Sequence, residues 1–169
     1  WDATEGGIRV PFLISGPKIK SNSQTNVSIS FSDLLPTIID LAGEEIFHEK
    51  LDGGSFKKIL HDEGKKVKRN FDGMVFHVPY ENKIALARAH SSIIVNKMKL
   101  IKFYDNNEIK LFDIENDLSE NEDLSNLNKN LFKKLELKLE NYLMSVRAPK
   151  WKPGITWKIN PIKIINSYH

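Results

Sequence analysis

The sequence predicts an α/β fold in which a small four-stranded antiparallel sheet is covered by a long C-terminal helix. Short apolar stretches separated by turn residues follow one another from Gly73 to Ile114, as is typical of antiparallel strands. Leucines then recur every four residues from Leu127 onwards, which indicates an amphipathic helix. An apolar run and a further helical pattern precede these elements. We therefore expect two regions: residues 1–63 form the end of a larger α/β domain, and residues 73–169 form the subdomain of sheet and helix.

The first expected element is a short buried strand that follows a pair of glycines. The glycines lie within Glu5-Gly6-Gly7-Ile8-Arg9-Val10-Pro11, where they suit a tight turn or a close backbone approach. The apolar run Phe12–Ser15 then predicts a strand with both faces covered, and Gly16-Pro17 ends it. We expect Arg9 to pair with Glu5, or with another buried acid, and so to hold the shape of the segment.

The second expected element is a helix that ends at Gly43. Ser32 is the predicted N-cap, Asp33 suits the first turn, and Pro36 lies early enough in the helix to be tolerated. Apolar residues at helical spacing predict that one face belongs to the core. These residues are Leu34, Leu35, Ile38, Leu41 and Ala42.

The stretch between this helix and the strands is rich in turn residues and cations. Asp52-Gly53 predicts a turn, and Ser55 predicts a helix cap rather than a site residue. The cationic stretch Lys57–Arg69 predicts an exposed loop and no anion site.

Four strands and one helix complete the expected fold. The middle two strands form a hairpin closed near Asn96-Lys97. The helix runs from about Ser125 to Val146 and ends before Pro149. A coiled coil is an alternative, but a spacing of four residues favours packing across one small sheet. The tail from Trp151 to His169 is expected to be irregular. The strands are Met74–Pro79, Ser92–Val95, Met98–Tyr104 and Ile109–Ile114.

Composition excludes several classes of function. The chain has no cysteine, which excludes disulfides, thiolate metal sites and a cysteine nucleophile. A net charge of +3 is too small to argue for a nucleic-acid partner, and no apolar run is long enough to span a bilayer. Asp and His residues do not cluster at metal-ligand spacing, and no glycine-rich loop would cradle a phosphate. We therefore expect no catalytic residue and no metal ligand in this chain.

Several short motifs, in this order, resemble type I sulfatases of the alkaline-phosphatase-like superfamily. The string EGGIRVPFLISGP resembles a conserved segment of that family, and SDLLPTIIDLAG resembles its next helix. The strings KLI and LFDI resemble the family's hairpin, and NDLSE resembles the turn after it, with Leu118 in place of a proline. The resemblance covers Glu5 to about Pro149 and implies the C-terminal part of an alkaline-phosphatase-like fold. Because the chain opens at Trp1, inside the motif, we expect it to be a piece of a longer protein.

The resemblance implies that the parent protein is a sulfatase, which hydrolyses sulfate esters. In that family a formylglycine made from a Cys, or a Ser, in a C-x-P-x-R signature attacks sulfur, and calcium polarises the sulfate oxygens. This chain lacks the signature, and the family's nucleophile and calcium ligands precede the glycine pair. We therefore expect calcium only in the parent enzyme, and we expect no activity in the isolated chain. The implied partners are the N-terminal catalytic half and a sulfated substrate, and the implied location is periplasmic, secreted or lysosomal.

Three residues are candidates for contact with substrate: His77, Arg88 and His90. His77 stands at a strand end that, in the family, approaches the mouth of the active site, although a lone strand histidine is usually hydrogen-bonded in the core. Arg88 could bind an anionic sugar bidentately, although such an arginine is usually a surface cation. The expected structural motif consists of Glu5, Gly6, Gly7, Arg9 and Pro11.

Two other functions stay open at this point. One is a related hydrolase of the same superfamily, a phosphodiesterase or a phosphonate hydrolase. The other is a non-catalytic domain that acts by binding. A C-x-P-x-R signature in the upstream coding region would exclude the binding domain and would favour a sulfatase over the related hydrolases.

Overall fold

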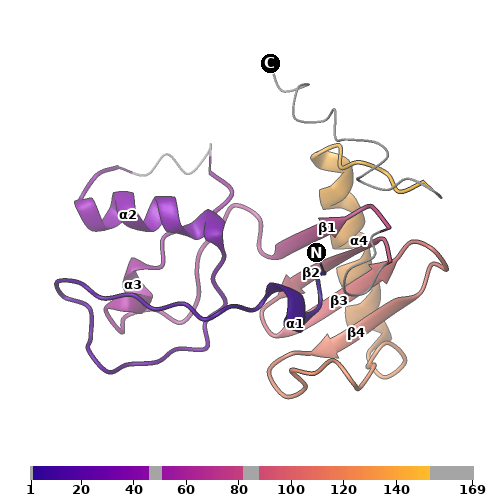
Figure 1. Ribbon diagram of the computed structural model, residues 1–169, viewed down its shortest axis with the longest axis horizontal. Coiled ribbons are helices and arrows are strands. Elements are labelled where there is room, and N and C mark those ends of the chain that lie inside the picture. Colours follow the sequence, from indigo (N-terminus) through magenta and orange to yellow (C-terminus); the bar gives the residue numbers. More distant parts are fainter. Residues whose placement is uncertain (1, 46–50, 82–87, 153–169) are drawn as a thin grey trace. The chain divides into compact units, whose positions relative to one another are not determined.

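The computed structural model describes residues 2–45, 51–81 and 88–152, which belong to two compact units (Figure 1). The sheet unit contains residues 1–10 and 75–169, and the helical unit contains residues 11–74. The sequence-based division instead placed residues 1–63 together. The first ten residues group with the sheet because His90 and Lys99 bind them. The expected irregular tail lies outside the described residues from position 153 onwards.

The predicted four-stranded sheet is confirmed. Its strands are neighbours in chain order, β1-β2-β3-β4, and the pairs β2–β3 and β3–β4 are antiparallel. A two-residue turn joins β2 to β3, and Asn96 in that turn has the left-handed φ of 55° that asparagine tolerates. The strands are β1 (Met74–Val78), β2 (His90–Val95), β3 (Met98–Phe103) and β4 (Ile109–Asp113).

The register of β3 decides which side chains share a face of the sheet. Leu100 lies opposite Ile93 and Leu111, so these three apolar residues share one face. Lys99 is the next residue, so it points to the other face. Both faces of β3 are buried: Leu100 lies on one of them, and Lys99 lies on the other with Ile101 and Phe103.

Helix α4 (Lys129–Ser145) covers the Leu100 face of the sheet. It contacts β2 and β3, and its Glu140 carboxylate lies 2.7 Å from Lys102 Nζ on that same face. Leu135 and Leu139 are buried, as their place in the leucine pattern predicts. The helix begins later than predicted, because the Asn128 side chain accepts a hydrogen bond from Leu131 N at 3.3 Å and caps it there.

The glycine pair forms one helical turn, α1 (Glu5–Ile8), rather than the expected tight turn. Thr4 O accepts hydrogen bonds from Gly7 N at 2.9 Å and Ile8 N at 3.1 Å. A Cβ atom at Gly7 would lie 2.5 Å from the Asp2 carbonyl oxygen, so this position requires glycine. Gly6 is different, since the nearest atom to such a Cβ would be 4.0 Å away.

The helical unit is built on the buried carboxylate of Asp33. This carboxylate accepts hydrogen bonds from Ser30 N at 2.7 Å and Gly54 N at 3.0 Å, and it forms a bidentate ion pair with Arg69. Ser30, not Ser32, is therefore the N-cap, and it completes a capping box with Asp33. The short helices of this unit are η1 (Phe31–Asp33), α2 (Leu34–Ala42) and α3 (Lys57–Leu60).

The stretch Lys57–Arg69 is not simply an exposed loop. It contains α3 and the buried Val67, and Arg69 ends it in the ion pair with Asp33. The number of cations was visible in the sequence. The pairing of Arg69 with Asp33 was not, because the two residues lie 36 positions apart. Ser55 is not the N-cap of α3, which is Phe56, but it lies one residue earlier and its hydroxyl accepts a hydrogen bond from Lys57 N at 3.1 Å.

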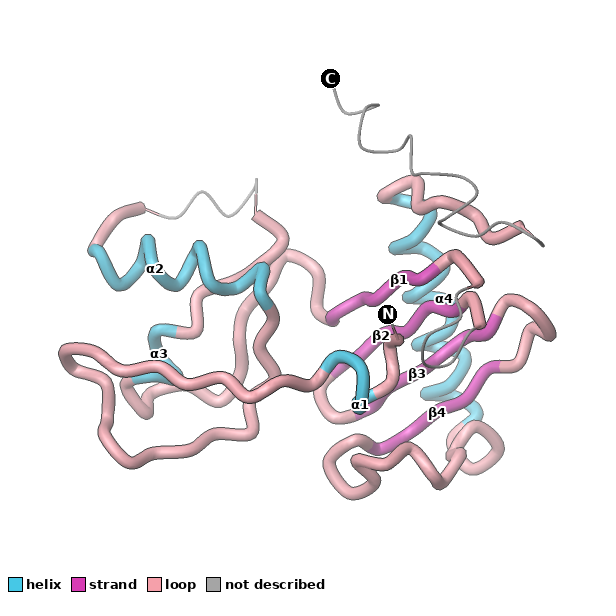
Figure 2. The backbone as a smooth tube through the Cα atoms, viewed as in Figure 1, coloured by secondary structure: helices cyan, strands magenta, loops and turns pink. Residues whose placement is uncertain are grey.

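The predicted buried strand Phe12–Ser15 is wrong for the chain as it stands. These residues form no strand, and Leu13 is 95% exposed. Figure 2 shows the segment as part of a long loop. A strand needs neighbours for its backbone N–H and C=O groups, and no described segment pairs with this one. The apolar face of α2 is also exposed, at Leu35, Ile38 and Leu41.

None of the described helices combines the length and the apolar character that crossing a membrane would require.

Replacing Leu139 with alanine should lower the free energy of unfolding by about 2–5 kcal/mol, because a buried leucine leaves a cavity. Leu139 is 1% exposed, whereas Leu137 on the same helix is 59% exposed. The matched control Leu137→Ala should change stability by less than about 0.5 kcal/mol. Denaturant unfolding of both variants measures the difference, and equal losses would show that the helix presents another face to the sheet.

Candidate functional site

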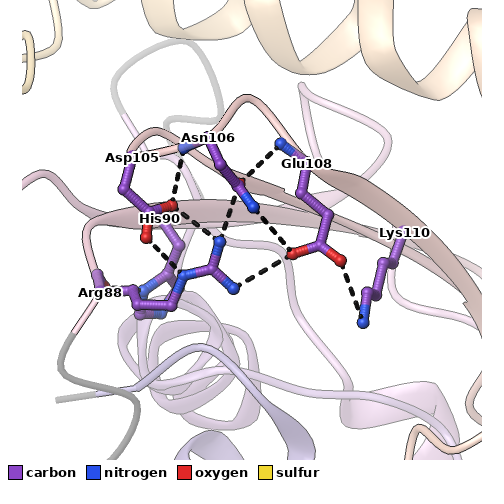
Figure 3. Close-up of polar contacts among 6 residues, drawn as sticks. All are labelled: Arg88, His90, Asp105, Asn106, Glu108 and Lys110. Carbon is purple, nitrogen blue, oxygen red and sulfur yellow. Dashed lines mark hydrogen bonds and ion pairs between the residues drawn. The ribbon is translucent and has the colours of Figure 1, made fainter.

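Arg88 is the centre of a polar cluster that lies where β2 begins and where β3 leads into β4 (Figure 3). It precedes β2, and its guanidinium lies 4.0 Å above the ring of Phe103 on β3. The loop between β3 and β4 supplies its other partners. Arg88 donates to both Asp105 oxygens at 2.7 Å, to Asn106 Oδ1 at 2.8 Å and to Glu108 Oε2 at 3.1 Å.

The charges of this cluster balance. Arg88 and Lys110 carry positive charge, and Asp105 and Glu108 carry negative charge. Hydrogen bonds from Arg88 lower the pKa of the Asp105 and Glu108 carboxyls, and the Asp105 hydrogen bond raises the pKa of Arg88. Within the described part of the chain, the hydrogen bonds of Arg88 engage four of the five N–H donors of its guanidinium.

His77 belongs to a hydrogen-bonded chain that ties β1 to the end of the helix region. Its Nε2 lies 2.8 Å from Pro149 O, which can only accept, so Nε2 carries the proton. Its Nδ1 lies 2.5 Å from Ser91 Oγ, which in turn lies 2.6 Å from Tyr104 Oη. Burial lowers the pKa of His77, so the neutral ring is favoured. Both ring nitrogens of His77 are used inside the protein.

His90 is fully buried at the start of β2 and binds two backbone groups. Its Nε2 accepts a hydrogen bond from Ala3 N at 2.9 Å. Its Nδ1 lies 2.6 Å from Arg88 O and must donate, because a carbonyl oxygen can only accept. The ring is therefore neutral with its proton on Nδ1. Burial is the main cause of a lowered pKa for His90.

The three candidates for substrate contact do not form one group. His90 lies opposite Phe103 and so shares its face of the sheet, whereas its neighbour Ser91, the partner of His77, points to the face of α4. Only Arg88 and His90 come together, through the Arg88 carbonyl and the shared contact with Phe103.

Lys99 holds the glycine-pair segment against the sheet. It is fully buried, and its Nζ lies 3.1 Å from Glu5 Oε1 and 2.7 Å from Glu120 Oε1. Glu120 Oε2 also accepts a hydrogen bond from Glu5 N at 2.9 Å. Arg9 adds a second cation, with Nη1 3.3 Å from Glu5 Oε2. Pro11 is exposed and begins the helical unit.

A pocket of about 490 Å³ lies beside this segment on the sheet face opposite α4. Its lining includes the aromatic rings of Phe103 and Phe112, the hydroxyls of Thr4 and Ser119, and the cation of Lys110. Among residues 2–45, 51–81 and 88–152, no group of three His, Cys, Asp or Glu side chains could hold a metal ion. The described part of the chain therefore does not fit a calcium site.

Sequence reasoning did not identify Lys99, Glu120, Asp105 or Glu108 as part of these clusters. The only available signal for Lys99 was a lysine at an inward position of an apolar strand, where a charge needs a partner. That signal predicts that an acid is near but does not say which one.

Comparison with known proteins identifies related sequences for most of the chain. A profile of the family described as N-sulphoglucosamine sulphohydrolase, C-terminal, matches residues 3–149. N-acetylglucosamine-6-sulfatase of Bos taurus is 43% identical over 56 residues, which are 33% of this chain and 10% of that protein. A sulfatase of Formosa agariphila is 26% identical over 161 residues, covering 86% of this chain and 29% of that protein. The chain thus spans less than a third of the length of these relatives.

Solved structures share the fold. A 2-O GAG sulfatase has a TM-score of 0.58 at 21% identity, covering 79% of this chain and 29% of that chain. A protein in complex with its substrate D-glucosamine-2-N,6-O-disulfate has a TM-score of 0.50 at 26% identity, covering 68% of this chain and 24% of that chain. These likenesses confirm the predicted α/β fold, and the family profile confirms the expected C-terminal portion of a sulfatase.

Replacing Lys99 with methionine should lower the free energy of unfolding by about 3–5 kcal/mol, because Glu5 and Glu120 would be left buried without their cation. The control Lys97→Met removes an exposed lysine from the adjacent turn, and it should cost less than about 1 kcal/mol. Thermal and denaturant unfolding of both variants compare the two losses. If both variants lost a similarly small free energy of unfolding, the buried ion pairs of Lys99 would stabilise the protein no more than the surface pairs of Lys97 do.

Proposed function

Because the chain belongs to the N-sulphoglucosamine sulphohydrolase C-terminal family, we propose that the protein containing it is an enzyme that hydrolyses sulfate esters. The match over residues 3–149 is the observation that carries this proposal. The proteins named as sulfatases among the relatives and the solved structures support it. A phosphodiesterase or phosphonate hydrolase, and a binding domain without chemistry, find no comparable support.

In this proposal the chemistry belongs to the rest of the protein. The chain has no cysteine from which a formylglycine could form, and its described residues hold no group that fits a metal ion. The nucleophile and calcium would therefore be supplied by an N-terminal catalytic half, and the isolated chain would be inactive. A periplasmic, secreted or lysosomal location is part of the same proposal.

The helical unit offers the surface on which that catalytic half would pack. Leu13 and the α2 residues Ile38 and Leu35 are well exposed in the chain. An apolar surface of this kind normally marks a contact with another protein part, and the relatives are more than three times as long as the aligned segment. Extra strands beside residues 12–15 would complete the missing backbone hydrogen bonds.

The substrate class is a sulfated sugar. The bovine relative is named for N-acetylglucosamine 6-sulfate, and one solved structure holds a glucosamine disulfate. Within this chain, Arg88 is the substrate contact that we favour among the three predicted residues. Its bonds to residues 88–152 engage four of its five N–H donors, whereas His77 and His90 use both ring nitrogens for internal bonds. In this assignment the two histidines support the sheet around it.

The full-length protein should hydrolyse an aryl sulfate, and the isolated 169-residue chain should show no turnover above background. A phosphodiester assayed in parallel distinguishes the related hydrolases. Hydrolysis of the phosphodiester alone would contradict the sulfatase, and turnover by the purified 169-residue chain would contradict the proposed division of roles.

In the full-length protein, Arg88→Gln should lower kcat/KM for a sulfated amino sugar by about 10-fold to 100-fold, since a hydrogen bond from a charged group contributes about 1.5–3 kcal/mol. Most of the effect should appear in KM, because Arg88 would bind the sugar rather than the reacting sulfate. A small aryl sulfate should be hydrolysed almost normally by the same variant.

The control for this experiment is Lys97→Gln, which removes a surface cation from the turn between β2 and β3. Its kinetics should match those of the unmodified protein. If Arg88→Gln keeps its melting temperature and also keeps its kcat/KM for the sulfated sugar, Arg88 does not contact the substrate.

A further inference from the structure

The segment 3–8 is bound to two neighbouring strands of the sheet by different chemistry. On β3, the buried Lys99 pairs with the side chain of Glu5. On β2, the imidazole of His90 accepts the backbone N–H of Ala3, which is itself completely buried. The first contact is an ion pair, and the second depends on one nitrogen lone pair.

The lone pair on His90 Nε2 exists only while the ring is neutral. The Nδ1 proton is already committed to Arg88 O at 2.6 Å, so a second proton must bind at Nε2. Protonated Nε2 and Ala3 N–H would then be two donors facing each other across 2.9 Å. The buried N–H of Ala3 would lose its acceptor, and a buried unsatisfied donor is costly.

We propose that His90 is a proton-sensitive latch that releases residues 3–8 from the sheet when its ring gains a second proton. The latch opens when His90 gains a proton, because the second proton removes the acceptor for Ala3 N–H. Among the polar contacts of the described residues, release would leave the ion pair of Glu5 with Lys99 and the hydrogen bond from Glu5 N to Glu120 to hold α1.

The charges around His90 act in both directions. Burial lowers the pKa of His90 and is the largest influence. The hydrogen bond to the Arg88 carbonyl and the charge of Asp2 raise this pKa, whereas the charge of Lys99 lowers it. The guanidinium of Arg88 lies on the Phe103 ring that His90 also contacts, and it adds a further positive charge to this region. Since the closed state favours the neutral ring, the latch is closed above the ordinary pKa of 6.5 and opens as the pH falls below it.

His77 provides a matched comparison within the same sheet. It too is a partly buried histidine whose pKa is lowered mainly by burial. Protonation at its Nδ1 breaks nothing, because Ser91 Oγ can accept a hydrogen bond as well as donate one. Proton uptake by His77 therefore leaves its two contacts in place.

Amide hydrogen exchange in the full-length protein tests the latch without an activity assay. Peptides covering residues 3–9 are followed from about pH 7.5 to about pH 5, with rates corrected for the intrinsic effect of pH. Below the ordinary histidine pKa, protection should fall by up to about tenfold for each pH unit, because the open state binds a proton that the closed state does not. His77→Gln should show the same loss.

His90→Gln should abolish the pH dependence over this range, because the glutamine oxygen can accept from Ala3 N but does not titrate. Loss of protection at the same pH in His90→Gln would overturn the proposal. A loss that persists in His90→Gln but disappears in Glu120→Gln would assign the effect to the carboxylates around Lys99 instead. Unchanged protection in the unmodified protein would overturn the latch as well.

A second measurement applies if His90→Gln fails to fold. In unmodified protein labelled with ¹⁵N-histidine, the ring of His90 should appear as the Nδ1–H form near neutral pH. The midpoint at which it becomes doubly protonated should coincide with the loss of Ala3 protection. Two separate midpoints, or an Nε2–H ring at neutral pH, would contradict the proposal.

Discussion

The buried ammonium of Lys99 is the interaction on which the sheet unit depends. It lies on a central strand, is fully buried, and meets carboxylates from two distant parts of the chain. Burying a charge is costly unless it is paired and hydrogen-bonded. Glu5 and Glu120 meet that need, and Arg9 adds a second cation beside Glu5. As a result, the short helix α1 and the turn after β4 are both fixed to the strand that carries Lys99.

The helical unit uses the same solution with the signs reversed. Here the fully buried group is the carboxylate of Asp33, and the cation is Arg69. Two glycines let neighbouring backbone come close to this centre. A Cβ atom at Gly53 would lie 1.9 Å from Ser32 O, and one at Gly54 would lie 2.0 Å from Lys68 O. Each unit thus combines a buried, ion-paired charge with a backbone approach that only glycine allows.

Local patterns in the sequence predicted most of the fold, and distant pairings account for most of what they missed. The hairpin at Asn96-Lys97 and the buried pair Leu135 and Leu139 follow from turn chemistry and helical spacing alone. The apolar run at residues 12–15 was also visible, and it was predicted to be a buried strand. An apolar pattern shows that a surface is suited to burial, but it does not show which segment covers it. Which acid pairs with Lys99, and which atoms surround Arg88, depends on the register of strands that lie far apart in the sequence.

The long separations in the sheet unit also set an order for its folding. Ala3 is 87 residues from His90, and Glu5 is 94 residues from Lys99 and 115 from Glu120. The hairpin of β2 and β3 closes over two residues, so it can form long before these contacts. At about 5–20 residues per second on the ribosome, Glu5 waits about 6–23 s before Glu120 has been synthesised. During that interval the segment 3–8 lacks the carboxylate of Glu120, which accepts the Glu5 N–H in the folded chain.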